Sequence, residues 1–188
     1  MSAPSDRETA IQRAALTAFS RYGFARTKME DIAAGAGLAR TALYKSYRNK
    51  EHVFRALAET VHREAYEAAQ TAFAADTPFP QRLIDALLAR DTHLLRIGHS
   101  GPHALEISEL YLKLAGDLAE RFNAQLVDLI AQEAETAAAA GEFELPPDFH
   151  SAQDFALVLR LALEGVKKEV KSVERFAQLA RQLINAML

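Results

Sequence analysis

Apolar residues recur every three or four positions along almost the whole chain. The first stripe, which ends before Gly23, comprises Ile11, Ala15, Ala18, Phe19 and Tyr22. One face of an α-helix has this period, whereas a half-buried strand alternates with a period of two residues. Alanine is abundant, runs of β-branched residues are scarce, and no stretch alternates. The sequence therefore predicts an all-α fold built from amphipathic helices.

About nine helices are expected, and segments rich in glycine and proline separate most of them. Asp76–Pro80, Gly98–Pro102 and Leu145–Asp148 are the clearest breaks, and Ser172 is a plausible cap between the last two helices. Gly116-Asp117 separates a sixth helix from a seventh, although one long helix also fits. The expected helices cover approximately residues 11–22, 29–36, 40–47, 50–75, 83–97, 103–114, 118–140, 151–169 and 173–187.

Charge is distributed unevenly between the two parts of the chain. Residues 1–50 contain nine Lys/Arg and four Asp/Glu, a net charge of +5, whereas residues 51–188 contain thirteen and twenty-one, a net charge of −8. Such asymmetry suggests that the N-terminal part meets a polyanion while the remainder has another role. Chance clustering on a solvated face would give the same count, so charge alone does not decide between these readings.

Several classes of protein are disfavoured by what the sequence lacks. There is no cysteine, which excludes disulfides and thiolate-bound zinc. No apolar run approaches the roughly 18 residues of a membrane span, and the polar N-terminal decapeptide has no signal-peptide character. A cytoplasmic protein without membrane contact is expected. Phosphate-binding loops, dinucleotide-binding glycine patterns and hydrolase motifs are missing, so neither an enzyme nor a cofactor is expected.

The most informative stretch is Gly23–Phe54. Thr27 and Glu30 have the spacing of a capping box, which starts a helix. The small residue Ala33 allows a second helix to cross closely, and Gly37 can adopt the positive φ that a tight turn between helices often requires. Met29, Ile32, Ala36, Leu38 and Leu43 supply apolar contacts between the two helices. This pattern predicts a helix-turn-helix, although a plain helical hairpin with a glycine corner shares part of it.

The second of these short helices would expose side chains that can reach DNA. Arginine and lysine bind guanine edges and phosphates, and methyl groups contact thymine. Asn49 is expected to cap the following helix, with Lys50 in its first turn, where free backbone N–H groups also favour a phosphate. The exposed residues are Arg40, Thr41, Ala42, Tyr44 and Lys45.

Over this stretch the chain resembles the TetR family of transcriptional regulators. The resemblance implies a helix-turn-helix domain over residues 1–49 and an effector-binding and dimerisation domain over residues 50–188. It departs from the family at Ala39, where a serine is frequent, so the side-chain cap of the recognition helix is missing at a cost of roughly 1 kcal/mol. The matching residues are Gly23-Phe24, Thr27, Asp31-Ile32-Ala33, Ala36-Gly37-Leu38, Thr41-Ala42-Leu43-Tyr44, Tyr47 and Asn49-Lys50-Glu51.

The resemblance also implies roles for individual residues. Thr27 and Lys28 would contact the DNA backbone, Tyr44 and Lys50 would contact phosphates, and Tyr47 would be a core aromatic. Arg40, Thr41 and Ala42 occupy the base-reading positions. The resulting DNA-binding set is Thr27, Lys28, Arg40, Thr41, Ala42, Tyr44, Lys45 and Lys50.

A homodimer and an effector cavity follow from the same resemblance. The last two helices carry apolar stripes that fit a dimeric four-helix bundle, although each residue could equally be ordinary core. The predicted interface comprises Phe155, Leu159, Ala162, Leu163, Val166, Phe176, Leu179, Ala180, Leu183, Ile184 and Met187. The cavity is expected among the fourth to seventh helices, with candidate lining residues Phe73, Leu87, Asp91, His93, Leu94, Ile97, His103, Ile107, Tyr111 and Phe122.

These inferences define a regulator with three partners: double-stranded operator DNA, a second copy of the chain, and a small-molecule effector. Repression relieved by the effector is the expected mode. The alternatives are an all-helical enzyme and a DNA-binding structural protein that senses nothing. A metal site at His93, His99 and His103 is disfavoured, because their spacing crosses Gly98 and Gly101-Pro102 and does not follow one helical face.

Overall fold

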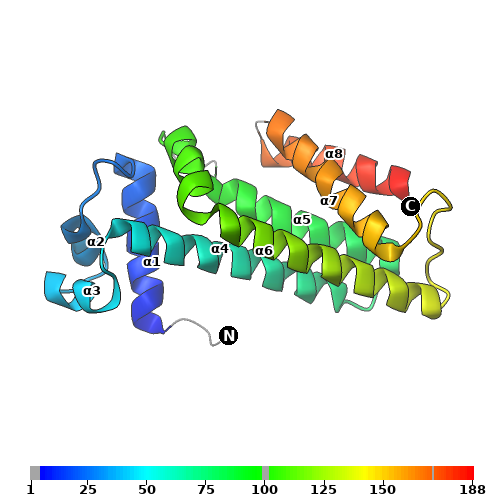
Figure 1. Ribbon diagram of the computed structural model, residues 1–188, viewed down its shortest axis with the longest axis horizontal. Helices are drawn as coiled ribbons and strands as arrows, with labels where there is room; N and C mark the ends of the chain where they lie inside the picture. Colours follow the sequence, from blue (N-terminus) through cyan, green and yellow to red (C-terminus); the bar gives the residue numbers. More distant parts are fainter. Residues whose placement is uncertain (1–4, 99–101, 171) are drawn as a thin grey trace. The chain divides into compact units, whose positions relative to one another are not determined.

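The computed structural model describes residues 5–98, 102–170 and 172–188. Within these ranges the chain forms eight α-helices and no strand, which confirms the all-α prediction (Figure 1). The expected count of about nine is close to the eight that are observed. The helices are α1 (Asp6–Tyr22), α2 (Met29–Gly35), α3 (Arg40–Ser46), α4 (Lys50–Phe73), α5 (Phe79–Gly98), α6 (Ala104–Ala139), α7 (Ala152–Glu169) and α8 (Val173–Met187).

The difference in count comes from α6, which runs without a break through Gly116-Asp117. A glycine inside a helix costs about 1 kcal/mol relative to alanine. The flanking residues Ala115 and Leu118 are buried together with Ala58 of α4. Their burial offsets that penalty, so the single long helix is correct and the predicted break is wrong.

Local capping explains where several helices begin. Ser5 and Glu8 form a capping box at the start of α1, and the hydroxyls of Ser151 and Ser172 accept backbone N–H groups of α7 and α8. The predicted cap at Ser172 is therefore confirmed. Asn49 caps α4, as expected, because its side-chain oxygen accepts the backbone N–H of His52 at 2.9 Å. These bonds satisfy donors that the helices themselves leave open.

The chain packs into two compact units. Unit 1 combines residues 1–61 with 97–118, and unit 2 combines residues 62–96 with 119–188, so α4 and α6 contribute to both. The functional division at residues 49 and 50 stays a prediction, because the packing units divide the chain elsewhere. The core of unit 1 contains the aromatic cluster of Phe19, Phe24 and Phe54, whose ring centroids lie 5.3–5.7 Å apart. Such tilted and edge-on contacts are favourable for aromatic rings.

The core of unit 2 contains most of the stripes that sequence analysis assigned to the dimer interface. The predicted interface residues that are at most 1% exposed are Phe155, Leu159, Leu163, Phe176, Ala180 and Ile184. They pack with Phe79, Leu83 and Leu87 of α5 inside a single chain. The other predicted interface residues, Ala162, Val166, Leu179, Leu183 and Met187, are half-buried. A different face of α7 is exposed, with Leu157, Val158 and Leu161 at 42%, 45% and 52%.

Candidate nucleic-acid interface and buried ionic cluster

The predicted helix-turn-helix is present and consists of α2, the turn at residues 36–39, and α3. Ile32 and Ala33 of α2 and Leu43 of α3 are buried together in the core of unit 1. Gly37 has φ +67°, and the N–H of Leu38 donates to the carbonyl of Ala33 at 2.9 Å. No side chain caps α3 at Ala39, as expected. The apolar side of α3 is therefore fixed against α2, and its opposite side is free to bind.

The start of α2 differs from the predicted Thr27–Glu30 capping box. Lys28 is the N-cap residue, and the carboxylate of Asp31 accepts its backbone N–H at 2.8 Å. The Thr27 side chain is 1% exposed, and its hydroxyl donates to the carbonyl of Gly23 at 2.7 Å. That geometry is incompatible with a side-chain contact from Thr27 to DNA. Thr27 instead closes the loop between α1 and α2.

The exposed side of α3 carries most of the predicted DNA-contacting residues. Thr41, Tyr44 and Lys45 are exposed, and Lys28 is exposed at the start of α2. Ala42 is half-buried, and its carbonyl accepts a hydrogen bond from the Arg7 side chain. Thr41, Tyr44 and Lys45 therefore lie on the exposed side of α3, away from the buried Leu43.

Arg40 has two partners on this face. Its guanidinium, which is 63% exposed, forms an ion pair with Glu30 at 2.8 Å and lies 5.3 Å from the ring centroid of Tyr44. Exposed pairs of this kind are worth about 1 kcal/mol or less. A stronger partner such as a guanine edge can therefore displace Glu30.

Lys50 does not point freely outward as sequence analysis expected. Its ammonium donates to the carbonyls of Phe24, Ala25 and Thr27 at 2.8, 3.1 and 3.3 Å. The same nitrogen lies 4.5 Å from the centroid of the Phe24 ring. An ammonium group has three N–H donors, and all three are used here. The structure thus gives Lys50 a role in holding the loop before α2, and the predicted phosphate contact has no free donor.

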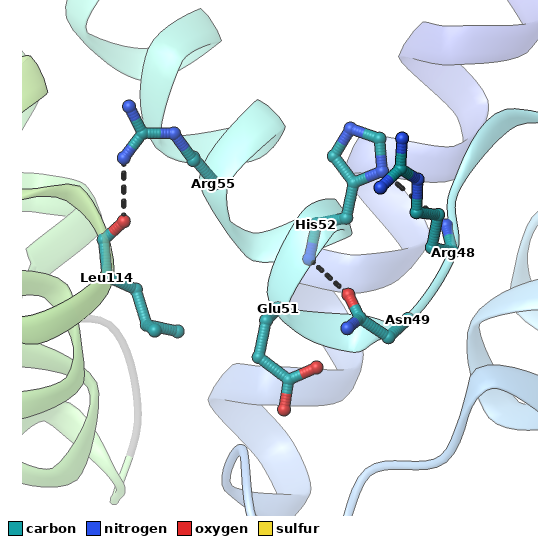
Figure 2. Close-up of a pocket in the computed structure, with 6 residues that line it drawn as sticks. All are labelled: Arg48, Asn49, Glu51, His52, Arg55 and Leu114. Carbon is teal, nitrogen blue, oxygen red and sulfur yellow. Dashed lines mark hydrogen bonds between the residues drawn. The ribbon is translucent and has the colours of Figure 1, made fainter.

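Next to the recognition helix lies a pocket of about 450 Å³ that sequence analysis missed (Figure 2). It is lined by Arg48, Asn49, Glu51, His52, Arg55 and Leu114. The Arg55 guanidinium donates to the Leu114 carbonyl at 2.8 Å and to the Asp117 carboxylate at 2.7 Å. Hydrogen bonding from Arg55 lowers the pKa of Asp117 to about 2. This pair ties α4 to α6 within unit 1. The sequence predicted Asn49 as a helix cap but gave no indication of a pocket beside it.

The predicted effector-lining residues are divided between the two units, and their shared role stays a prediction. Phe73 and Leu87 are part of the packed core of unit 2, whereas Ile97, His103, Ile107 and Tyr111 belong to unit 1. In unit 2, Leu94 is half-buried, and His93 lies 3.5 Å from Glu64. His99, from the disfavoured metal site, lies outside the described residues. Among the residues that are described, no three metal-ligating side chains cluster.

Asp91 and Phe122, by contrast, mark a buried ionic cluster in unit 2. Arg90 donates to Asp91 and to Asn123, both at 2.6 Å. Lys167 lies 3.3 Å from Asp91 and 2.7 Å from Glu164. Arg90 and Asp91 are each at most 4% exposed. The cluster joins α5, α6 and α7, and sequence analysis found only Asp91 of its members.

His62 of α4 lies at the edge of this cluster and is buried. Its ring stacks on Phe122, with centroids 5.3 Å apart and planes inclined by 12°. Burial, and then the positive charges of Arg90, Lys167 and Arg121, lower the pKa of His62 from 6.5 to about 4. His62 is therefore neutral at physiological pH, and it brings a fourth helix to the cluster.

Comparison with known proteins identifies the class. Residues 11–57 match the family described as "Bacterial regulatory proteins, tetR family". Those residues contain α2, α3 and the turn between them. They therefore form a TetR-type helix-turn-helix domain, and the resemblance predicted from Gly23–Phe54 is confirmed.

Individual relatives agree with this class. The uncharacterized HTH-type transcriptional regulator YhgD of Bacillus subtilis (strain 168) is 31% identical over 96 residues, which cover 49% of this chain and 50% of that protein. The chain thus spans about half the length of the curated relative it matches.

Solved structures match over nearly the whole chain. A transcriptional regulator from Cytophaga hutchinsonii has a TM-score of 0.74 at 17% identity, with 97% of each chain covered. SmeT, the repressor of the Stenotrophomonas maltophilia efflux pump SmeDEF, has a TM-score of 0.65 at 22% identity, with coverage of 95% and 88%. A TetR-like regulator from Rhodococcus sp. RHA1 has a TM-score of 0.59 at 23% identity, with coverage of 98% and 96%. The chain has the fold of TetR-type transcriptional regulators.

The contacts of Lys50 generate a stability prediction. Lys50→Ala removes three charge-assisted hydrogen bonds and leaves their acceptors less satisfied, so it is expected to lower the free energy of unfolding by about 1.5–3 kcal/mol. Lys45→Ala, at an exposed site on the neighbouring helix, serves as the control and is expected to change stability by less than about 0.5 kcal/mol. Urea denaturation followed by circular dichroism measures both. If Lys50→Ala leaves the free energy of unfolding unchanged, Lys50 does not hold the loop, and a phosphate contact is again the better assignment.

The lowered pKa of His62 predicts how stability depends on pH. Because the pKa is about 4 in the folded chain and 6.5 ordinarily, the unfolded chain takes up a proton first as pH falls. Stability is lost across this window, by up to about 3 kcal/mol at the acid end. His62→Gln should show a correspondingly smaller loss between pH 7 and pH 4, while the exposed control His150→Gln should follow the wild type. Equal losses in all three proteins would contradict the assignment.

Proposed function

We propose that this chain is a transcriptional repressor that binds operator DNA through α3, acts as a homodimer, and is released by a small-molecule effector. The observation that carries the proposal is the exposed face of α3, where Arg40, Tyr44 and Lys45 stand opposite the buried Leu43. A helix held on one side and polar on the other fits the major groove of DNA. The family match over residues 11–57 supports the same assignment.

Within this interface, different side chains have different tasks. Arg40 would exchange Glu30 for a guanine edge, while Lys28, Tyr44 and Lys45 would contact phosphates. Thr41 and the half-buried Ala42 would lie against base edges. Phosphate contacts position the protein, and base contacts select the sequence. Lys50 acts indirectly, by holding the loop that precedes α2.

Arg40 and Lys45 should therefore respond differently when DNA is varied. After operator selection in vitro, Arg40→Ala is expected to lose preference at one base pair, at a cost of about 1–3 kcal/mol on the operator and little on random duplex. Lys45→Ala should weaken binding to both and reduce the slope of log affinity against log salt by about one. Gel shifts over a range of salt concentrations measure both. Equal losses by Arg40→Ala on operator and random DNA would reject base reading.

A second copy of the chain is the proposed occupant of the exposed apolar face of α7. Leu157, Val158 and Leu161 lie within four positions of one another and share one side of the helix. A symmetric pair presents two recognition helices to a palindromic site, whereas one short helix reads few base pairs. This face replaces the buried residues of the predicted interface. Half-buried Ala162 and Val166 lie next to it in sequence.

Charged substitutions on this exposed face of α7 should separate the two protomers of the dimer without unfolding them. Leu161→Glu together with Val158→Glu is expected to give a folded monomer, because both positions are about half exposed in the single chain. Leu112→Glu, at a 73% exposed position on α6, is the control and should leave the dimer intact. Light scattering gives the mass, and circular dichroism checks the fold. A double variant that remains dimeric would place the interface elsewhere.

The effector is proposed to bind in unit 2, beside the buried ionic cluster. Replacing a buried ion pair by apolar residues is often neutral or stabilising, so stability alone gives little reason to retain one. His62, Phe122 and Asn123 add an aromatic wall and polar groups, which is the mixture a small-molecule site needs. Among proteins of this fold, SmeT has been solved in complex with triclosan. Native mass spectrometry of the purified protein would reveal a co-purifying ligand directly.

Helix α4 is proposed to connect effector and operator binding. It begins at the Asn49 cap, directly after the recognition helix, and carries His62 in unit 2. A shift of α4 would change the spacing of the recognition helices, which must match one DNA turn of about 34–36 Å. Such coupling is typically 1–3 kcal/mol and reciprocal. A ligand that binds the free protein and the operator complex with equal affinity would exclude this coupling. If no metabolite extract changes the gel shift of the operator, a DNA-binding protein that senses no effector is favoured.

A further inference from the structure

A groove of about 750 Å³ runs between α1 and α2 within unit 1. It follows α1 from Ala10 to Tyr22, and residues of α2 from Asp31 to Gly35 form part of its other wall. At 1.5 Å per residue this stretch of α1 is about 18 Å long, or a little over three helical turns. The groove is separate from the pocket in Figure 2 and from the exposed face of α3.

Small side chains form the floor of the groove. Ala10, Ala14 and Ala18 recur at every fourth position of α1, so they lie on one side of the helix. Gly35 of α2 faces them, and a Cβ atom at this glycine would lie only 3.1 Å from the Cβ of Ala14. A floor of alanine and glycine lets the backbone of an incoming helix approach closely.

Arginines line the groove and give it a positive charge. Arg13 and Arg21 are two turns apart on α1, about 12 Å along the axis, and Arg26 lies in the loop before α2. Within the part of the chain that the structure describes, none of the three forms an ion pair. The lining includes one carboxylate, Asp31, which accepts the backbone N–H of Lys28. The groove lining thus has three guanidinium groups and one carboxylate, an excess of positive charge.

The groove runs along α1 away from the end of this helix that contacts the recognition helix. Arg7, near the N-terminal end of α1, donates to the Ala42 carbonyl of the recognition helix, so this end of α1 is the one next to α3. Arg21 lies fourteen residues further, about 21 Å along the helix. Beyond it, a Cβ at Gly23 would lie 3.0 Å from the His103 ring, which also lines the groove. The part of the groove beside Arg21 and His103 is therefore the part of α1 farthest from the contact between Arg7 and α3.

We propose that the groove between α1 and α2 binds an acidic amphipathic helix of a partner protein. Small apolar residues of that helix pack on the alanine floor. Glutamate or aspartate side chains at positions i and i+7 or i+8 pair with Arg13 and Arg21, whose separation they match. A helix in a groove is a recurrent mode of recognition, with apolar contacts for affinity and charge for selection. The inference is independent of operator and effector binding.

Fluorescence anisotropy with synthetic peptides tests this proposal on the full-length protein. The probe is a fluorescein-labelled alanine-based peptide of about sixteen residues, long enough to be helical, with glutamates at the stated spacing. The matched control peptide has glutamine at those positions. We expect the glutamate peptide to bind roughly tenfold more tightly, in a salt-dependent manner. Equal binding of both peptides overturns the proposal.

Three protein variants locate the binding. Arg13→Glu combined with Arg21→Glu should abolish the preference for the glutamate peptide, whereas Arg175→Glu, an exposed charge reversal on α8, should not. Ala34→Leu narrows the groove at an exposed helical position without changing charge, and it should weaken peptide binding severalfold. Circular dichroism confirms that each variant is folded.

A competition experiment between the peptide and duplex DNA tests whether the groove binds DNA instead of an acidic helix. If random duplex DNA displaces the peptide and Ala34→Leu has no effect on either ligand, the arginines form a general polyanion surface and the proposal is rejected. If DNA does not compete and Ala34→Leu weakens the peptide alone, the acidic helix is supported. Operator affinity, measured separately with Arg40→Ala as reference, keeps this outcome distinct from the fate of the proposed repressor function.

Discussion

The loop between α1 and α2 depends on one half-buried interaction, the contact of the Lys50 ammonium with three backbone carbonyls and with the Phe24 ring. The loop has left the helical ladder, so its carbonyls need donors from elsewhere. Lys50 supplies them from the first turn of α4, and Phe24 packs against Phe19 and Phe54. The start of α2 and the first turn of α4 are thereby fixed to each other. The recognition helix, which lies between them in sequence, is positioned by both.

Much of this arrangement was predictable because short-range rules determine it. Gly37 has the positive φ expected of the turn, Ile32 and Leu43 are buried as their spacing predicted, and Asn49 caps the next helix. The errors arose where two local solutions compete. Thr27 and Lys28 are adjacent, and either could precede α2. The Thr27 hydroxyl donates to the carbonyl of Gly23, four residues earlier, and Lys28 is the N-cap residue.

Longer-range features were less accessible from sequence. The role of Lys50 depends on carbonyls more than twenty positions away, whereas its place in the first turn of a helix and the family resemblance predicted a phosphate contact. The cluster of Arg90, Asp91 and Lys167 joins residues as many as 76 positions apart, and no local pattern links them. Isolated charges in amphipathic helices usually face water, so their convergence in unit 2 could not be anticipated. Their burial is nevertheless the main physical argument for a binding site there.

The predicted dimer interface shows a limit of periodicity itself. The apolar stripes of α7 and α8 correctly predicted that Phe155, Leu159 and Ile184 are buried. A stripe reports that a helical face avoids water, but it does not report which surface covers it. The larger apolar face of α7 packs against α5 within the chain. The smaller apolar face, with Leu157, Val158 and Leu161, stays exposed. In a helical protein that assembles, a second apolar face on one helix is therefore more informative about partners than the dominant face. On α7 this second face is where a copy of the chain can still be accommodated.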